Sequence, residues 1–160
     1  MTRTRQKGFS LIELLIVVAI ILIIAAIAIP NMLRSKISAN EASAVASIRS
    51  INVATVMYNS QCPAVGYPDT LKELGPSGSA ACTMGTNMLD NVLGQTTPQK
   101  SGYTFTYVVV PIGGLNASYT LNADPVVRNV SGQRSFYSDP SGVVHYNATA
   151  VAGPGDPIIQ

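Results

Sequence analysis

Few side chains in this 160-residue sequence could do chemistry, and they are scattered along the chain. The only histidine is His145, and the only cysteines are Cys62 and Cys82. If the chain is exported, an even number of cysteines favours a disulfide, which would close a loop of about 20 residues. Two buried free thiols are the alternative. A metal site has less support, because His145 is the only other soft ligand.

The carboxylates do not form a recognisable catalytic or metal-binding set. Asp124, Asp139 and Asp156 could contribute to a calcium site, because calcium prefers carboxylate oxygens in loops, but their spacing matches no dedicated calcium loop. We therefore expect no metal, no cofactor and no enzymatic activity. Three Asn-x-Ser/Thr triplets are short enough to arise by chance; they begin at Asn116, Asn129 and Asn147.

The acid with the most unusual setting is Glu13. It lies in the segment Phe9–Ile29, whose only other polar residue is Ser10. These 21 positions match the roughly 20 residues that a helix needs to cross a hydrocarbon core. A carboxylate disfavours insertion of such a segment, strongly at mid-membrane and less near the interface.

Basic residues precede this apolar segment and predict its topology. Arg3, Arg5 and Lys7 hold the N-terminus in the cytoplasm while the following chain is exported. Without these three, seven basic residues (10 − 3) face eight acidic ones. The exported part forms no basic stripe, so we expect no specific nucleic-acid site.

Several ordinary explanations compete for the apolar segment. A buried core helix needs a polar face, which this segment lacks. A cleaved secretory signal would explain the basic start and the triplet Ala26-Ile27-Ala28, which resembles a small-residue cleavage site. However, the stretch exceeds the usual apolar length of about 7–15 residues, and a disposable signal gains nothing from Glu13. The remaining possibility is a helix that stays on the protein as a membrane anchor.

The N-terminus resembles the class III signal of type IV pilins and pseudopilins. The likeness rests on a short basic leader ending in Gly8, on the run Phe9-Ser10-Leu11-Ile12-Glu13-Leu14-Leu15, and on an apolar stretch that closes at Pro30. Glu13 matches the family's glutamate at the fifth mature position, and Pro30 its helix-kinking proline. Two departures are visible: Ser10 replaces a common threonine, and Leu22 stands where many major pilins have glycine.

The resemblance implies how the chain is processed and which proteins process and assemble it. A prepilin peptidase and methyltransferase would cut between Gly8 and Phe9 on the cytoplasmic side, with Gly8 required before the cut, and would methylate the new amine at Phe9. An inner-membrane assembly platform and its ATPase machinery would then polymerise the subunit.

Cutting before the apolar run leaves the exported protein with a helix that has to be buried in a membrane or against copies of itself. Glu13 can set the register of such copies, because a carboxylate in an apolar setting needs a partner. The new amine at Phe9 lies about 6 Å away along the same helix but points away, whereas a shifted neighbour brings its own amine alongside. That contact repeats head to tail into an open helical filament. An intramolecular pair, or an acid at the headgroup level, is the alternative.

The helical pattern continues past Pro30. Apolar residues fall on one arc at about 100° per residue and predict a single helix from Phe9 to about Asn59, kinked near Pro30. The residues of this arc are Ile37, Val45, Ile48, Ile51 and Val56.

The rest of the chain predicts short helices and then strands. Thr70–Glu73 is a capping box stopped by Gly75-Pro76, and Met88–Leu93 suggests another short helix. Strands are expected at 103–108, 117–121, 135–138 and 143–146, with turns at 111–114 and 139–142. These elements predict an α+β fold in which one long N-terminal helix packs under a small antiparallel sheet of about four strands. The family resemblance implies the same architecture.

The expected organisation has six parts. They are a leader peptide at 1–8, a transmembrane or filament-core half-helix at 9–30, an amphipathic half-helix at 31–59, a connecting loop with short helices at 60–100, a sheet at 101–148 and a flexible tail at 149–160.

Three functions follow from this organisation. The first is a pilin that starts in the inner membrane with its N-terminus in the cytoplasm and becomes a cell-surface filament for adhesion, motility or DNA uptake. The second is a pseudopilin in a periplasmic secretion filament, although the carboxylate-rich calcium loop usual in major pseudopilins is not seen. The third is an anchored or secreted binding module that never polymerises, whose mature chain could start at Ile29.

Overall fold

The computed structural model describes residues 8–76 and 87–159. The chain divides into two compact units, Met1–Ser35 and Lys36–Gln160, which we describe separately. The second unit is called the head domain below. The division falls five residues beyond Pro30, where the sequence placed the end of the apolar half-helix.

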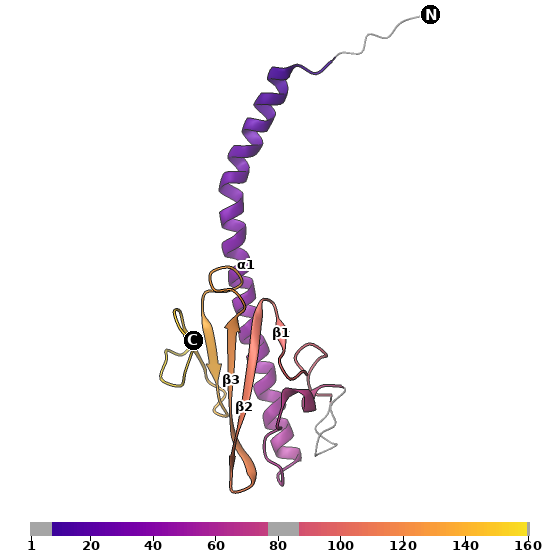
Figure 1. The fold of residues 1–160 in the computed structure, drawn as a ribbon, viewed down its shortest axis with the longest axis vertical. Helices are drawn as coiled ribbons and strands as arrows, with labels where there is room; N and C mark the ends of the chain where they lie inside the picture. Colours follow the sequence, from indigo (N-terminus) through magenta and orange to yellow (C-terminus); the bar gives the residue numbers. More distant parts are fainter. Residues whose placement is uncertain (1–7, 77–86, 160) are drawn as a thin grey trace, which may run out of the picture. The chain divides into compact units, whose positions relative to one another are not determined.

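One long helix dominates the N-terminal part of the chain. Helix α1 runs from Leu11 to Gln61, close to the predicted span (Figure 1). Pro30 lies inside it, and the helix continues on both sides of the proline. A kink at that position stays a prediction.

Within the head domain, α1 turns one face towards the sheet. The buried residues recur every three or four positions, as an amphipathic helix requires. Ile48 and Ile51 lie on this face as predicted, whereas Val56 is 48% exposed, so its assignment to the buried arc was wrong. The apolar residues of the buried face are Ala44, Ile48, Ile51, Ala54 and Tyr58.

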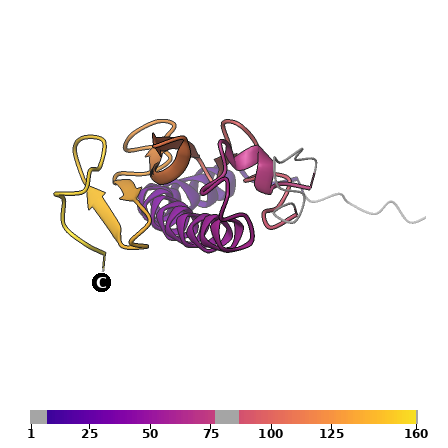
Figure 2. The same cartoon turned by 90° about the horizontal axis from the view of Figure 1, so that it is seen from below.

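The sheet is antiparallel and has five strands in the order of the sequence. Figure 2 shows strands lying along one side of α1. The α+β architecture is therefore confirmed, with one strand more than predicted. The strands are β1 (Gln99–Lys100), β2 (Tyr103–Ile112), β3 (Leu115–Pro125), β4 (Ser135–Ser138) and β5 (Val144–Asn147).

The core of the head domain forms between α1 and the inner face of the sheet. In β2 and β3 the buried and half-exposed residues alternate near the helix, which is the period of a strand with one covered face. Tyr119 contacts two other rings, edge-on with Tyr67 at 4.9 Å and stacked with Tyr107 at 5.3 Å. The hydrophobic sheet residues with no exposed surface are Tyr103, Phe105, Tyr119, Leu121, Ala123 and Phe136.

Tight turns connect the strands where the sequence supplies suitable residues. Gly113 and Gly114 both adopt positive φ, and they join β2 to β3 in a two-residue hairpin. The turn at Asp139–Gly142 is confirmed, with the Gly142 N–H donating to the Asp139 carbonyl at 2.9 Å. Strand β2 extends past its predicted end because a register shift between Val110 and Pro111 accommodates the proline.

The connecting region is less helical than predicted. Leu71–Leu74 forms a short 3-10 helix, η1, but the Thr70 side chain makes no capping hydrogen bond. A helix at Met88–Leu93 was wrong: this segment is a turn in which Asp90 Oδ1 accepts the N–H groups of Val92 and Leu93. An aspartate that binds its own following backbone competes with the helix.

A glycine allows the connecting region to touch the sheet. Gly66 has a φ of 89°, and a Cβ there would lie 2.3 Å from the Asn116 carbonyl oxygen. The neighbouring residues bond to the same strand: the Tyr67 N–H donates to the Asn116 carbonyl, and the Asn116 N–H donates to the Val65 carbonyl. The close approach extends the sheet locally.

The C-terminal segment makes hydrogen bonds to β5 and to Arg128, and its flexibility stays a prediction. The Ile159 N–H donates to the Val144 carbonyl, and the Tyr146 N–H donates to the Pro157 carbonyl. The guanidinium of Arg128 also donates to the carbonyl oxygens of Ala148 and Ala150. These bonds place the segment against β5.

An ion pair between a buried carboxylate and a partly exposed arginine ties α1 to the segment that leads into β4. Glu41 is 7% exposed, and its Oε1 accepts the N–H groups of Gln133 and Arg134. Its Oε2 accepts the Arg134 guanidinium, with the Nη2 nitrogen at 2.8 Å. Burial, the largest single effect, raises the pKa of Glu41, but the hydrogen bonds from Gln133 and Arg134 together with the charge of Arg134 lower that pKa overall.

We predict that Glu41→Gln destabilises the head domain at neutral pH by about 2 kcal/mol. A lowered pKa in the folded state contributes stability above the unfolded pKa, and this contribution is lost as the pH falls through the folded pKa. The difference in free energy of unfolding between the wild type and the variant should therefore shrink below about pH 4. Chemical denaturation of the detergent-solubilised chain at several pH values measures it, and a difference independent of pH would contradict this assignment.

Candidate functional site

The candidate site is the N-terminal segment, and its first feature is the start of α1. The Leu14 N–H donates to the Ser10 carbonyl at 3.2 Å, which begins the helix. The Glu13 side chain folds back, and its Oε2 accepts the Ser10 N–H at 2.9 Å. This is the carboxylate half of a capping box, and the spacing Ser-x-x-Glu in the sequence could have revealed it.

The cap leaves Glu13 with unused acceptor capacity. A carboxylate has about four lone-pair positions, and only one hydrogen bond to Glu13 is found in the part of the chain that the structure describes. Glu13 also lies in the first helical turn, where the helix dipole favours a negative charge. The carboxylate is therefore oriented at the helix start and can accept a second donor. Its pairing with the Phe9 amine of a neighbour stays a prediction.

Gly8 and Phe9 precede the helix and are exposed. The exposed fraction of Phe9 is 75%. A Cβ at Gly8 would meet no atom of the described residues within 4 Å, and the backbone there does not have the positive φ that favours glycine. The fold therefore gives no reason for a glycine at this position.

The apolar segment that follows is uncovered in a single chain. Helix α1 is long and apolar enough to cross a membrane, with a mean hydropathy of 3.3 in its most apolar 18-residue window and none of that window buried. Ile23, for example, is 64% exposed, and Ile29 is 66% exposed. Such a surface fits a membrane-anchored precursor.

Cys62 directly follows α1 and is buried. It is disulfide-bonded. Its expected partner, Cys82, lies outside the described residues, so the pairing stays a prediction.

The remaining polar candidates do not gather into one site. No group of three or more His, Cys, Asp or Glu side chains that could hold a metal is found within residues 8–76 and 87–159. The Nδ1 of His145 lies 2.6 Å from the Asp156 carbonyl, and its ring meets Tyr137 edge-on. Asp139 caps its own turn through Ser141, and Asp124 has one buried oxygen, Oδ1, without a hydrogen-bond partner.

The asparagines of the three glycosylation triplets differ in their hydrogen bonds and exposure. The Asn116 amide donates to the Tyr67 carbonyl, and the Asn147 amide donates to the Asp156 carboxylate. Asn129 is exposed. The sequence alone could not make this distinction.

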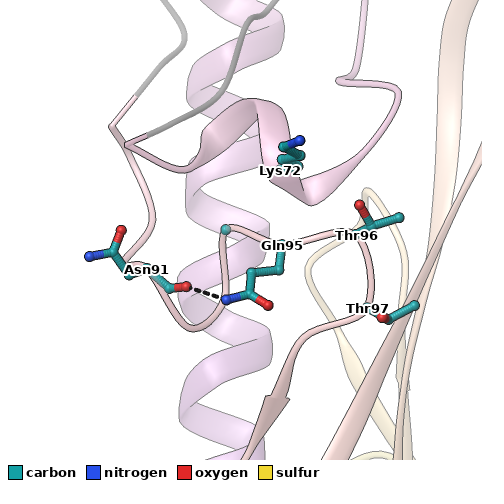
Figure 3. Close-up of a pocket in the computed structure, with 6 residues that line it drawn as sticks. Lys72, Asn91, Gln95, Thr96 and Thr97 are labelled. Atoms are coloured by element: carbon teal, nitrogen blue, oxygen red, sulfur yellow. Dashed lines mark hydrogen bonds between the residues drawn. The ribbon is translucent and has the colours of Figure 1, made fainter.

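An open polar pocket lies beside η1 (Figure 3). Its volume is about 600 Å³. The Gln95 amide donates to the Asn91 carbonyl at 2.8 Å across one wall. The labelled lining residues are Lys72, Asn91, Gln95, Thr96 and Thr97, and all five are exposed. A hollow of exposed side chains with one internal bond does not define a catalytic arrangement.

Comparison with known proteins agrees with the N-terminal features. Residues 3–29 match the family described as carrying the prokaryotic N-terminal methylation motif. The chain is 39% identical over 71 residues to the type IV major pilin of Myxococcus xanthus, which covers 44% of this chain and 31% of the pilin. It is 63% identical over 35 residues to the type IV wide pilus major component of Thermus thermophilus, covering 22% of this chain and 27% of that protein.

A second group of relatives takes part in secretion. The chain is 36% identical over 58 residues to the type II secretion system core protein G of Aeromonas hydrophila, covering 36% of this chain and 41% of that protein. No solved structure matches the chain. The aligned parts span less than half the length of these relatives. The chain thus carries the prokaryotic N-terminal methylation motif and is homologous to type IV pilins and to type II secretion core proteins, as the resemblance implied.

We predict a single disulfide between Cys62 and Cys82. Closing a loop of this length stabilises a fold by about 3 kcal/mol in the chain-entropy model, so Cys62→Ser should lower the free energy of unfolding by about that amount. Peptide mapping under non-reducing conditions should recover one cross-linked peptide pair. Recovery of both cysteines as free thiols would contradict the pairing.

Proposed function

We propose that this chain is the precursor of a structural filament subunit of the type IV pilin kind, with no catalytic role. After loss of residues 1–8 the subunit would keep its apolar helix and polymerise through it. The observation that carries the proposal is the apolar surface of α1, which is uncovered in a single chain and has one oriented carboxylate, Glu13, in its first turn. The pilin and core protein G relatives support the same class.

The route begins at the inner membrane. A prepilin peptidase and methyltransferase would cut between Gly8 and Phe9 and methylate the new amine, with the N-terminus still in the cytoplasm. Gly8 supports this step. The structure has room for a larger side chain at this position, so a requirement for glycine there would come from the peptidase and not from the fold. An assembly platform and its ATPase would then extract the subunit into a cell-surface filament used for adhesion, motility or DNA uptake.

The second candidate is a pseudopilin in a periplasmic secretion filament. The several core protein G relatives support it. The location of the filament separates the two candidates, because a pilin is recovered in filaments sheared from the cell surface. A non-polymerising binding module is separated from both by its mature N-terminus.

We predict that Gly8→Leu blocks removal of the leader while leaving the head domain unchanged. The structure has room for the side chain at position 8, so a processing defect would report recognition by the peptidase. Mass spectrometry of the membrane-bound chain should find Met1 or Thr2 at the N-terminus in the variant and a methylated Phe9 in the wild type. A wild-type chain that starts at Ile29 would exclude this route.

We predict that Glu13→Ala abolishes assembly while the precursor still inserts in the membrane. An unpaired amine buried among apolar helices is costly, so a subunit without the carboxylate should not add to a filament. The measurement is the amount of subunit in sheared filaments relative to the membrane pool. Normal filaments from Glu13→Ala would refute the pairing of Glu13 with a neighbour's amine.

A further inference from the structure

The connection between β3 and β4 exposes three valines within five residues. The exposed fractions of Val126, Val127 and Val130 are 52%, 52% and 55%. We call residues 126–131 the valine loop. A single exposed apolar side chain is ordinary on a protein surface, whereas a cluster marks a place where another molecule or a membrane is contacted.

The valine loop satisfies most of its backbone donors within the chain. The Val127 N–H donates to the Ser131 hydroxyl oxygen, and the Ser131 hydroxyl donates to the Val127 carbonyl. Five of the six N–H groups at 126–131 are bonded to the protein in this region, and these are the N–H groups of Val126, Val127, Asn129, Val130 and Ser131. A segment with its backbone donors satisfied can enter a poorly hydrated interface at little cost.

The one charged residue of the loop turns into the protein. The guanidinium of Arg128 donates to four acceptors, which are the Ser135 hydroxyl and the carbonyl oxygens of Gln133, Ala148 and Ala150. Apart from the exposed Asn129, the side chains that the loop presents to its surroundings are therefore apolar.

The loop is fastened to the part of α1 that follows the apolar segment. The Asn40 amide donates to the Ser131 carbonyl at 2.8 Å. Asn40 follows Ile29 by eleven residues (40 − 29) of continuous helix. Their separation is therefore at most about 17 Å, whatever angle the two units of the chain take. Along the chain, the valine loop is attached to the portion of the head domain that is nearest to the membrane anchor.

The residues between the apolar segment and the head domain suit an anionic lipid surface. Arg34 and Lys36 are both exposed. No acidic residue occurs between Glu13 and Glu41. Positive charges that flank a membrane segment are attracted to anionic headgroups. The exposed valines and the neighbouring charges therefore favour the same partner.

We propose that the valine loop contacts the lipid surface beside its own anchor while the subunit is a membrane-anchored precursor. Its three valines would lie at the boundary between headgroups and acyl chains, which removes their exposed area from water. This inference rests on the membrane-anchored state in the proposed function and adds a second point of contact with the bilayer. A second copy of the chain is the competing partner.

The first experiment uses the absence of tryptophan from the sequence. Val127→Trp in the full chain, reconstituted into vesicles of phosphatidylethanolamine and phosphatidylglycerol, places one indole on the loop. We expect a blue-shifted emission and strong quenching by lipids brominated near the headgroup end of their acyl chains. The matched control is Val53→Trp, whose valine is 61% exposed on α1. It lies thirteen residues (53 − 40) beyond Asn40, about 20 Å farther along the helix, and should lose severalfold less emission.

The second experiment tests whether the apolar side chains cause the contact. Val126→Asp combined with Val130→Asp, in the Val127→Trp chain, should remove most of the quenching, because carboxylates resist leaving water and are repelled by phosphatidylglycerol. Val126→Ile combined with Val130→Ile should preserve the quenching. Both valines are exposed, so the circular dichroism spectrum of the folded chain should not change. Quenching of the aspartate variant equal to that of its parent would contradict the proposal.

The outcomes separate this inference from the proposed function. An inserted chain whose Val127→Trp emission matches that of Val53→Trp would overturn the lipid contact alone. A blue shift that brominated lipids do not quench, and that disappears when the protein is diluted in lipid, would identify a second copy as the partner and overturn the lipid contact as well. A full chain that does not insert into the vesicles would overturn the anchored state, and with it both proposals.

Discussion

An apolar helix surface with no cover in the single chain is the constraint on which the other features depend. Water cannot solvate about 20 consecutive apolar residues at an acceptable cost, so the helix needs either lipid or protein around it. The head domain has a complete core of its own, built from one face of α1 and the inner face of the sheet. The chain therefore combines a self-sufficient domain with a segment that depends on other molecules.

The polar groups at the start of α1 restrict how neighbouring copies of the chain can align. Hydrophobic burial alone does not fix the register between neighbouring helices, because it is not directional. A carboxylate in an apolar setting, by contrast, needs a specific hydrogen-bond or ionic partner. The cap from Ser10 holds the Glu13 carboxylate at the helix start and leaves it able to accept a second donor. The new positive amine at Phe9 of a neighbour, four positions before Glu13 in the sequence, is a donor of the right charge.

Much of the fold could be predicted from local sequence patterns. The composition of residues 9–29 predicts the apolar part of α1, and the alternation from Tyr103 to Val108 predicts a strand with one covered face. Strand β1 could not be predicted, because Gln99 and Lys100 pair only through a hairpin to β2 and have no pattern of their own. The helix expected at Met88–Leu93 fails because Asp90 binds the following backbone.

The candidate site could be predicted only in part, because some of its contacts join residues far apart in the sequence. Glu13 is conspicuous in the sequence because of its apolar neighbours, while its bond to Ser10 needed attention to the capping spacing. Glu41 looks like one of several polar residues on a helix surface, and its partner Arg134 lies 93 residues away in sequence. Two hollows beside α1 are completed by Ile159 and by the turn before β5, so no local pattern could show them.

The central claim is that the processed subunit keeps its apolar helix and buries it among copies. Mass spectrometry of the assembled polymer, isolated from the cell surface or the periplasm and imaged by electron microscopy, measures this most directly. The account predicts filaments whose subunit begins at a methylated Phe9. A monomeric, water-soluble chain that lacks residues 9–28 would contradict it.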